Sequence, residues 1–174
     1  MNQQSINMSA AGPPQGAKAP SGGSEPRAAG SVGALVVLDT NIVLDAFVFG
    51  DAAALPVRDG LKDGTLQWIA TQAMRDELQR VLAYPKIIPR LAFYQLDAAQ
   101  VMAAFDQHVR IVEVAAKADI TCKDADDQKF IDLAVAHGAL LLSKDAAVLS
   151  MAKRLQARGA AARTTLTPPS TSPA

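Results

Sequence analysis

The stretch that decides the fold runs from residue 34 to residue 41 and reads ALVVLDTN. Its first five residues form a short apolar run, which is typical of a strand buried on both faces of a parallel sheet. Asp39 follows the last apolar residue directly, and Asn41 comes two positions later. The pattern predicts a buried strand that ends in a polar loop.

The same pattern of an apolar run followed by polar residues returns near the other end of the chain. Residues 139–142 read ALLL and predict a strand, and Ser143, Lys144 and Asp145 follow it. Other strands are predicted over 66–70, 111–114 and, more weakly, 163–166. Amphipathic helical patterns separate these strands: up to residue 47, over 52–61, 74–82 and 101–105, over 130–135 with a stop at Gly138, and over 148–155 with a stop at Gly159. This alternation predicts a mostly parallel sheet covered by helices on both faces.

Composition bounds the function classes. The chain has 174 residues, 49% of them hydrophobic, which suits one domain with a sizeable core. It has 17 basic and 17 acidic residues, so any nucleic-acid binding must use a local patch. One cysteine excludes a disulfide within the chain and fits a reducing cytoplasm. The longest apolar runs are too short to span a membrane, so no membrane association is expected.

The two ends of the chain differ from its middle. Residues 1–33 are rich in Gly, Pro, Ser and Ala, and residues 167–174 read TPPSTSPA. Such segments cannot bury enough apolar surface to offset the entropy of ordering them. We therefore expect disordered tails on either side of a domain over 34–166.

Acidic residues from distant parts of the chain are expected to meet at one edge of this sheet. Asp39 and Asp145 follow two parallel strands, whose carboxyl ends lie on the same side. Glu77 sits beside the apolar stripe of its helix, and Asp127 precedes the stripe of another helix by one turn. Carboxylates that converge without partners repel one another by several kcal/mol at short range, so they require protons, basic groups or cations. Carboxylate oxygens suit Mg²⁺ or Mn²⁺, which can activate water and stabilise charge on a phosphate ester.

Simpler roles exist for each of these acids. Asp39 and Asp145 are well placed to cap the helices that follow them, and the acids of residues 124–127 suit the first turn of a helix. Asp39 is also a candidate phosphate acceptor in an aspartate-based phosphotransfer domain, although Asn41 stands where such domains usually carry a second acid. A dinucleotide site is disfavoured, because no Gly-rich turn follows the first strand.

Four motifs in order resemble those of the PIN-domain family, in particular the branch of toxin components of bacterial toxin–antitoxin systems. The motifs are VVLDTN at 36–41, TQAMRDEL at 71–78, KDADDQKFIDLAVAHGA at 123–139 and LLSKD at 141–145. The resemblance covers roughly residues 34–166. It implies a three-layer α/β/α sandwich with strand order 3-2-1-4-5, cleavage of single-stranded RNA with Mg²⁺ or Mn²⁺, a homodimer and an antitoxin partner. The alternative is a non-catalytic PIN-like module that binds RNA or protein.

The resemblance also assigns site residues. The catalytic, metal-binding acids map onto Asp39, Glu77, Asp127 and Asp145, with Asn41 and Ser143 in supporting positions. The third position is open among Asp124, Asp126 and Asp127; the inward face of the helix favours Asp127, and Asp124 is the second candidate. Similar sequences often carry an aspartate at the position of Gln128.

Basic residues near these motifs are candidates for contact with RNA phosphates. The residues that flank the acidic motifs are Arg75, Lys123, Lys129 and Lys144. A second group, which follows the Glu77 motif and could line the approach to the site, comprises Arg80, Lys86 and Arg90.

Overall fold

The computed structural model describes residues 33–166. The predicted disorder of the two tails concerns residues outside this range, apart from Gly33, which directly precedes the first strand. All structural statements below refer to the described residues.

A five-stranded parallel sheet forms the centre of the domain, with the strand order β3-β2-β1-β4-β5. Its strands are β1 (Ala34–Leu38), β2 (Leu66–Ala70), β3 (Val109–Ile111), β4 (Leu140–Leu142) and β5 (Ala161–Arg163). The strand order predicted from the sequence is therefore confirmed. The order reverses between β1 and β4, where a crevice opens beyond the carboxyl ends of the strands.

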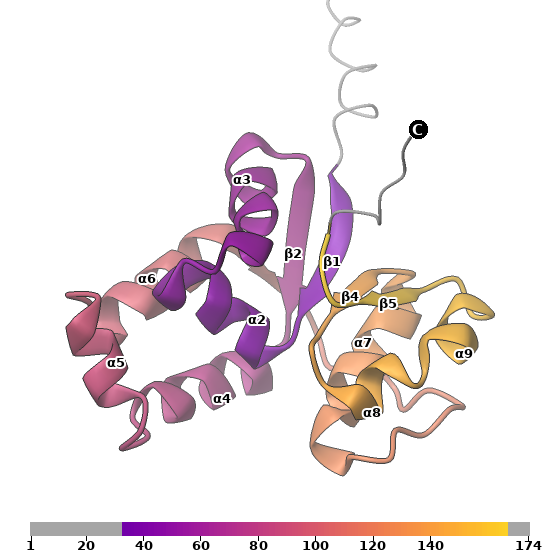
Figure 1. The fold of residues 1–174 in the computed structure, drawn as a ribbon. Helices are drawn as coiled ribbons and strands as arrows, with labels where there is room; N and C mark the ends of the chain where they lie inside the picture. The colour runs from indigo at the N-terminus through magenta and orange to yellow at the C-terminus, as the bar shows by residue number, and fades with distance from the viewer. Residues whose placement is uncertain (1–32, 167–174) are drawn as a thin grey trace, which may run out of the picture. The chain divides into compact units, whose positions relative to one another are not determined.

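Helices cover both faces of this sheet, as expected for parallel strands. Figure 1 shows the helices that precede β3 on one side of β1 and β2, and those that follow β3 on the other side. The first group comprises α2 (Thr40–Leu44), the π-helical turn η3 (Asp45–Phe49), η4 (Ala52–Ala54), α3 (Leu55–Asp63), α4 (Gln72–Leu82), α5 (Ile88–Phe93) and α6 (Ala98–His108). The second group comprises η5 (Ala125–Asp127), α7 (Gln128–His137), α8 (Ala146–Leu149) and α9 (Ala152–Gln156).

The two outer strands begin two residues earlier and end three residues earlier than the sequence predicted. The last pair of β3 joins Ile111 to Ala70, where β2 ends, so the apolar residues after Ile111 have almost no strand left to pair with. Val112 still donates its amide to Ala70, and Val114 is 79% exposed. At the other edge, β4 is only three residues long and pairs with Ala161–Arg163, so the predicted fifth strand is present but overlaps the range 163–166 only at Arg163.

The helices also differ from the sequence prediction in two places. The helix expected over 148–155 is broken between α8 and α9, around Ser150 and Met151. The helix α5 was not predicted from the sequence. Pro89 stands in the first turn of α5, where proline is tolerated because the amide it lacks would have no partner within the helix.

Aromatic packing ties helices of the first group to the sheet. Trp68 of β2 is buried, stacks on Phe47 at 5.9 Å between ring centroids, and meets the edge of Phe105 at 4.8 Å. Such contacts add stabilisation beyond simple burial. They fix η3 and α6 against β2, and with η3 the adjoining helix α2, which begins directly after Asp39.

No single helix among residues 33–166 is long and apolar enough to cross a bilayer. The bent pair of helical segments Thr40–Phe49 and Ala52–Asp63 meets the length and composition criteria only when both are taken together.

Candidate metal centre

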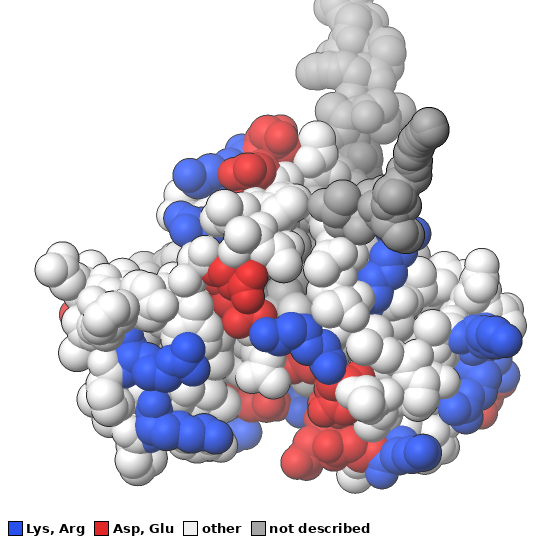
Figure 2. Space-filling view, viewed as in Figure 1, with Lys and Arg blue, Asp and Glu red and all other residues white. Residues whose placement is uncertain are grey.

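The four acids predicted from the sequence line one cleft at the carboxyl ends of β1 and β4. Asp39, Glu77, Asp127 and Asp145 all border this cleft, whose volume is about 300 Å³. The space-filling view shows acidic side chains gathered below α8 and basic side chains over α4 and α5, with a hollow between them (Figure 2). The cleft is also bordered by Thr40, Asn41, Leu44, Val81, Tyr84, Lys86, Ile87, Asp124 and Asp126.

Strand register places Asp39 beside Ser143. Leu38 pairs with Leu142, and the amide of Asp39 donates to the carbonyl of Leu142 at 3.0 Å. The carboxylate of Asp39 is buried and accepts two hydrogen bonds, from the Ser143 hydroxyl at 2.6 Å and from the Asn41 amide at 3.3 Å. Asp39 thus caps α2 and faces the cleft at the same time. Asn41 supports Asp39 through its backbone, not through its exposed side chain.

Ser143 also holds Asp145. The amide of Asp145 donates to the Ser143 hydroxyl oxygen at 3.0 Å, while the Asp145 carboxylate caps α8 through the Ala147 amide at 2.8 Å. Because Ser143 is fully buried and its hydroxyl has one proton, which goes to Asp39, the direction of these hydrogen bonds is set. One hydroxyl therefore fixes the acids that follow β1 and β4.

Asp127 belongs to a group of three neighbouring carboxylates. Oxygen atoms of Asp124, Asp127 and Asp145 lie within 4.8 Å of one another. Asp127 is buried, and its Oδ2 atom has no hydrogen-bond partner. Asp124 is exposed and accepts from the Asp126 amide at 2.9 Å. Of the three acids left open by the sequence, Asp124 and Asp127 thus join Asp145, while the helical pattern rightly predicted Asp127 as the buried one.

The pKa values of two cleft acids are raised. Burial raises the pKa of Asp127 to about 7, with a further rise from the negative charges of Asp145, Asp39 and Asp124. Burial also raises the pKa of Asp39, although its hydrogen bonds from Ser143 and Asn41 act in the opposite direction. Repulsion by Asp145 and Glu77 adds to that rise. The cleft therefore carries an excess of negative charge that a cation would relieve.

Glu77 differs from the other acids because it has a basic partner. Its Oε1 atom lies 2.6 Å from the Lys129 ammonium, and its Oε2 atom accepts a hydrogen bond from the Thr40 hydroxyl at 3.2 Å. Thr40 was missed in the sequence, although it stands between Asp39 and Asn41 in the first motif. The sequence holds no signal for this contact, because Glu77 lies 37 residues away along the chain.

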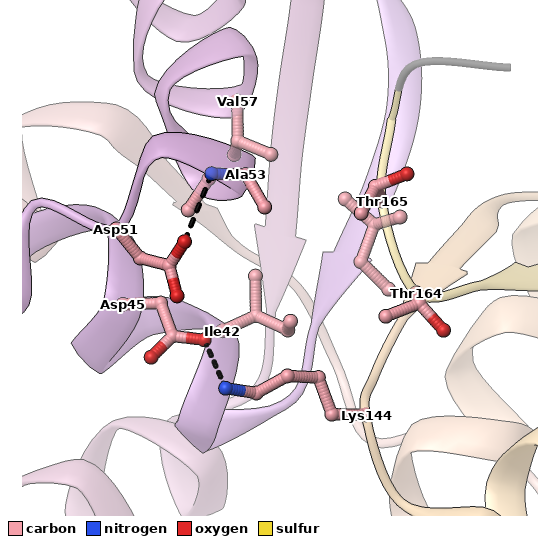
Figure 3. Close-up of a pocket in the computed structure, with 10 residues that line it drawn as sticks. Ile42, Asp45, Asp51, Ala53, Val57, Lys144, Thr164 and Thr165 are labelled. Carbon is pink, nitrogen blue, oxygen red and sulfur yellow. Dashed lines mark hydrogen bonds and ion pairs between the residues drawn. The ribbon is translucent and has the colours of Figure 1, made fainter. Parts of the chain in front are cut away.

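Three of the four basic residues that flank the motifs form ion pairs within the domain. Arg75 makes a two-pronged ion pair with Asp106, and Lys129 pairs with Glu77. Lys144 turns away from the acids and lies 2.6 Å from Asp45, at the edge of a separate small pocket (Figure 3). Lys123 is exposed and has no ion pair among the described residues. Their contact with RNA stays a prediction.

The residues of this cleft fit a divalent cation. The candidate ligands are all carboxylate oxygens, the donor type that Mg²⁺ and Mn²⁺ prefer. The partnerless Oδ2 atom of Asp127 is a buried polar atom that would otherwise cost free energy. A bound cation would satisfy this atom and offset the repulsion among the acids.

Known proteins resemble this chain in sequence pattern and in fold. The chain is similar to a chain in the crystal structure of VapBC2 from Rickettsia felis bound to a DNA fragment from their promoter, with a TM-score of 0.50 and 14% identity over 74% of this chain and 97% of that chain. At this identity the likeness shows a shared fold. No curated protein matches the chain.

The family model of the PIN domain matches residues 35–147, a span that runs from the first strand through Asp145 and includes every acid of the cleft. The chain therefore belongs to the PIN-domain family.

Proposed function

We propose that this chain is a metal-dependent ribonuclease that hydrolyses phosphodiester bonds of single-stranded RNA. The observation that carries the proposal is the meeting of Asp39, Glu77, Asp127 and Asp145, from four distant segments, in one cleft. Helix capping explains Asp39 and Asp145 separately, but it does not explain why a buried Asp127 lies among other acids with an oxygen atom unpaired.

The proposed ligands of Mg²⁺ or Mn²⁺ are these four acids, with Asp124 as an additional candidate. When bound, the cation supplies polarisation of water and neutralises charge that develops on a phosphate. Ser143 keeps Asp39 oriented through its hydroxyl, Thr40 does the same for Glu77, and Lys129 neutralises Glu77. Lys86, at the border of the cleft, offers a positive charge to an entering phosphate.

The experiment is a cleavage assay on the purified full chain with a labelled unstructured RNA and a labelled hairpin. We expect cleavage of the unstructured RNA in Mg²⁺ or Mn²⁺, none in EDTA, and none by Asp39→Asn. The matched control is Asp51→Asn, which caps η4 on the protein surface as Asp39 caps α2. Equal cleavage by wild type and Asp39→Asn would overturn the proposal, and RNA binding without any cleavage would favour the non-catalytic alternative.

The same proposal places this ribonuclease as the toxin of a toxin–antitoxin pair, inhibited by a protein partner and assembled as a homodimer. The similar chain belongs to VapBC2, crystallised with a fragment of promoter DNA, which supports a partnered toxin. Induced expression in a bacterial host should arrest growth, and Asp39→Asn should not. Rescue by a small protein encoded next to this gene would identify the antitoxin, and sedimentation would test the dimer.

A further inference from the structure

The segment from residue 78 to residue 96 has a charge unlike that of the rest of the chain. It contains Arg80, Lys86 and Arg90 and no acidic residue, whereas the whole chain has equal numbers of basic and acidic residues. All three cations are exposed, and none of them forms an ion pair within the described residues. A local positive patch in a chain without net charge indicates an anionic partner.

The same segment carries the exposed aromatic side chains of the described domain. Tyr84, Phe93 and Tyr94 are 46%, 78% and 40% exposed, while Trp68 and Phe130 are buried in the core. Exposed rings among cations are the combination that proteins use to bind single-stranded nucleic acids: rings stack on bases, and cations meet phosphates.

Ring contacts join two of these side chains, Phe93 and Tyr94, to Phe49 and Arg90. Phe93 packs edge-on against Tyr94 at 5.0 Å between centroids, and Tyr94 lies 6.0 Å from Phe49. The guanidinium of Arg90 lies over the ring of Phe49, 3.7 Å from its centroid. The cation is thus held on an aromatic face and not neutralised by a carboxylate.

This surface begins at the acidic cleft. Tyr84 and Lys86 border the cleft that holds the acids, and α5 leads from there to Arg90, Phe93 and Tyr94. Basic side chains over α4 and α5 face the acids across the hollow in Figure 2. The acids of the cleft would repel the phosphates of an RNA strand, whereas the cations of this neighbouring surface would attract them.

We propose that residues 84–94 form a track that binds the bases and phosphates of a single-stranded RNA next to the bond in the cleft. The cleavage of RNA next to this track rests on the proposed function, whereas the binding of RNA to the track does not. Six helical residues of α5 span about 9 Å, roughly the length of two or three stacked nucleotides. Tyr84 and Phe93 stack on bases, and Lys86 and Arg90 contact phosphates.

The test measures binding of a fluorescent 12-nucleotide single-stranded RNA by anisotropy, with the full chain in EDTA so that no cleavage occurs. We expect Tyr84→Leu and Phe93→Leu each to weaken binding about tenfold, and Tyr84→Phe to bind like wild type, because the ring is retained. Arg90→Ala should lower the slope of log Kd against log salt by about one. Lys153→Ala, an exposed cation on α9, is the matched control and should leave Kd unchanged. Thermal melts of every variant confirm folding.

The outcomes separate this inference from the proposed function. Weaker RNA binding by both leucine variants without any metal-dependent cleavage by wild type would support the track and overturn the ribonuclease. Cleavage by wild type with unchanged binding by both variants would overturn the track alone. Unchanged RNA binding with an altered sedimentation coefficient would assign the rings to a protein interface and also overturn the track.

Discussion

Two groups of aspartates in this domain are in opposite electrostatic environments. On the outer surface, Asp106 and Asp119 each meet a guanidinium, Arg75 and Arg158 respectively, which lowers the pKa of both carboxyl groups. In the cleft, burial and neighbouring acids raise the pKa of Asp127. Asp106 and Asp119 are therefore paired with cations, whereas Asp127 lies among other acids at the edge of the sheet without a cation from the described residues beside it. Such an arrangement is typical of a functional site.

The largest effect is expected when one acid is removed from the cleft. We expect Asp145→Asn to reduce metal-dependent RNA cleavage about 1,000-fold, because one carboxylate ligand and the charge that it supplies are lost. Asp106→Asn removes an equal charge from the outer surface and should leave cleavage unchanged. Initial rates on the same labelled RNA measure both, and equal losses in the two variants would contradict a special role for the cleft.

A smaller effect concerns stability and pH. Since the pKa of Asp127 is about 7 in the folded chain and near 3.8 when unfolded, this group favours the folded state at low pH. That contribution is lost as pH rises from about 4 through 7. We expect Asp127→Asn to stabilise the metal-free chain at pH 8 by about 1–2 kcal/mol, which is roughly 3–8 °C in Tm. Below about pH 4 the two proteins should melt alike.

For the surface acid Asp106, the same experiment should show a change in stability of the opposite sign. Arg75 lowers the pKa of Asp106, so this group favours the folded state at neutral pH and loses that effect as pH falls below about 4. Asp106→Asn should therefore destabilise the chain at pH 8, by less than about 1 kcal/mol because the pair is exposed. Destabilisation by both variants at pH 8 would contradict the assignment of repulsion to Asp127.

The smallest effect is expected at Glu77, the one of the four candidate metal-binding acids that has a cation beside it in the described domain. Lys129 neutralises Glu77 at the border of the cleft and so competes with an added cation for this acid. We expect Lys129→Met to increase Mn²⁺ affinity about threefold, within the range of partly exposed ion pairs. Isothermal titration measures the affinity directly, and weaker Mn²⁺ binding by the variant would instead assign Lys129 to holding Glu77 in place.

The sequence predicted the centre of the sheet better than its edges. Residues 34–38 and 66–70 match β1 and β2 because mostly apolar five-residue segments mark strands that are buried on both faces. At the edges, the partner strand decides where pairing ends, and Ile111 and Arg163 mark that limit. The apolar pattern of one segment does not show how long the neighbouring strand is, so it cannot predict where the pairing ends.

In the site, the sequence likewise predicted where the acids lie but not which partners the basic side chains have. The position of an acid within three residues of the end of a strand was enough to predict that Asp39 and Asp145 lie at the same edge of the sheet, where both border the cleft. The direction of the long basic side chains was not predictable. Lys129 and Lys144 form ion pairs with acids that only the folded chain brings within reach. Thr40 was missed for the same reason, since its partner Glu77 lies 37 residues away.

The hydrogen bond between Ser143 and Asp39 joins residues 104 positions apart, and this separation has a consequence in time. A ribosome that adds 5–20 residues per second needs roughly 5–20 s to extend the chain from the first acid to the last. During that interval the nascent polypeptide carries only part of the cleft and no β4 against which Asp39 can be fixed. The acids that the proposed activity needs therefore come together only after β4 has been synthesised.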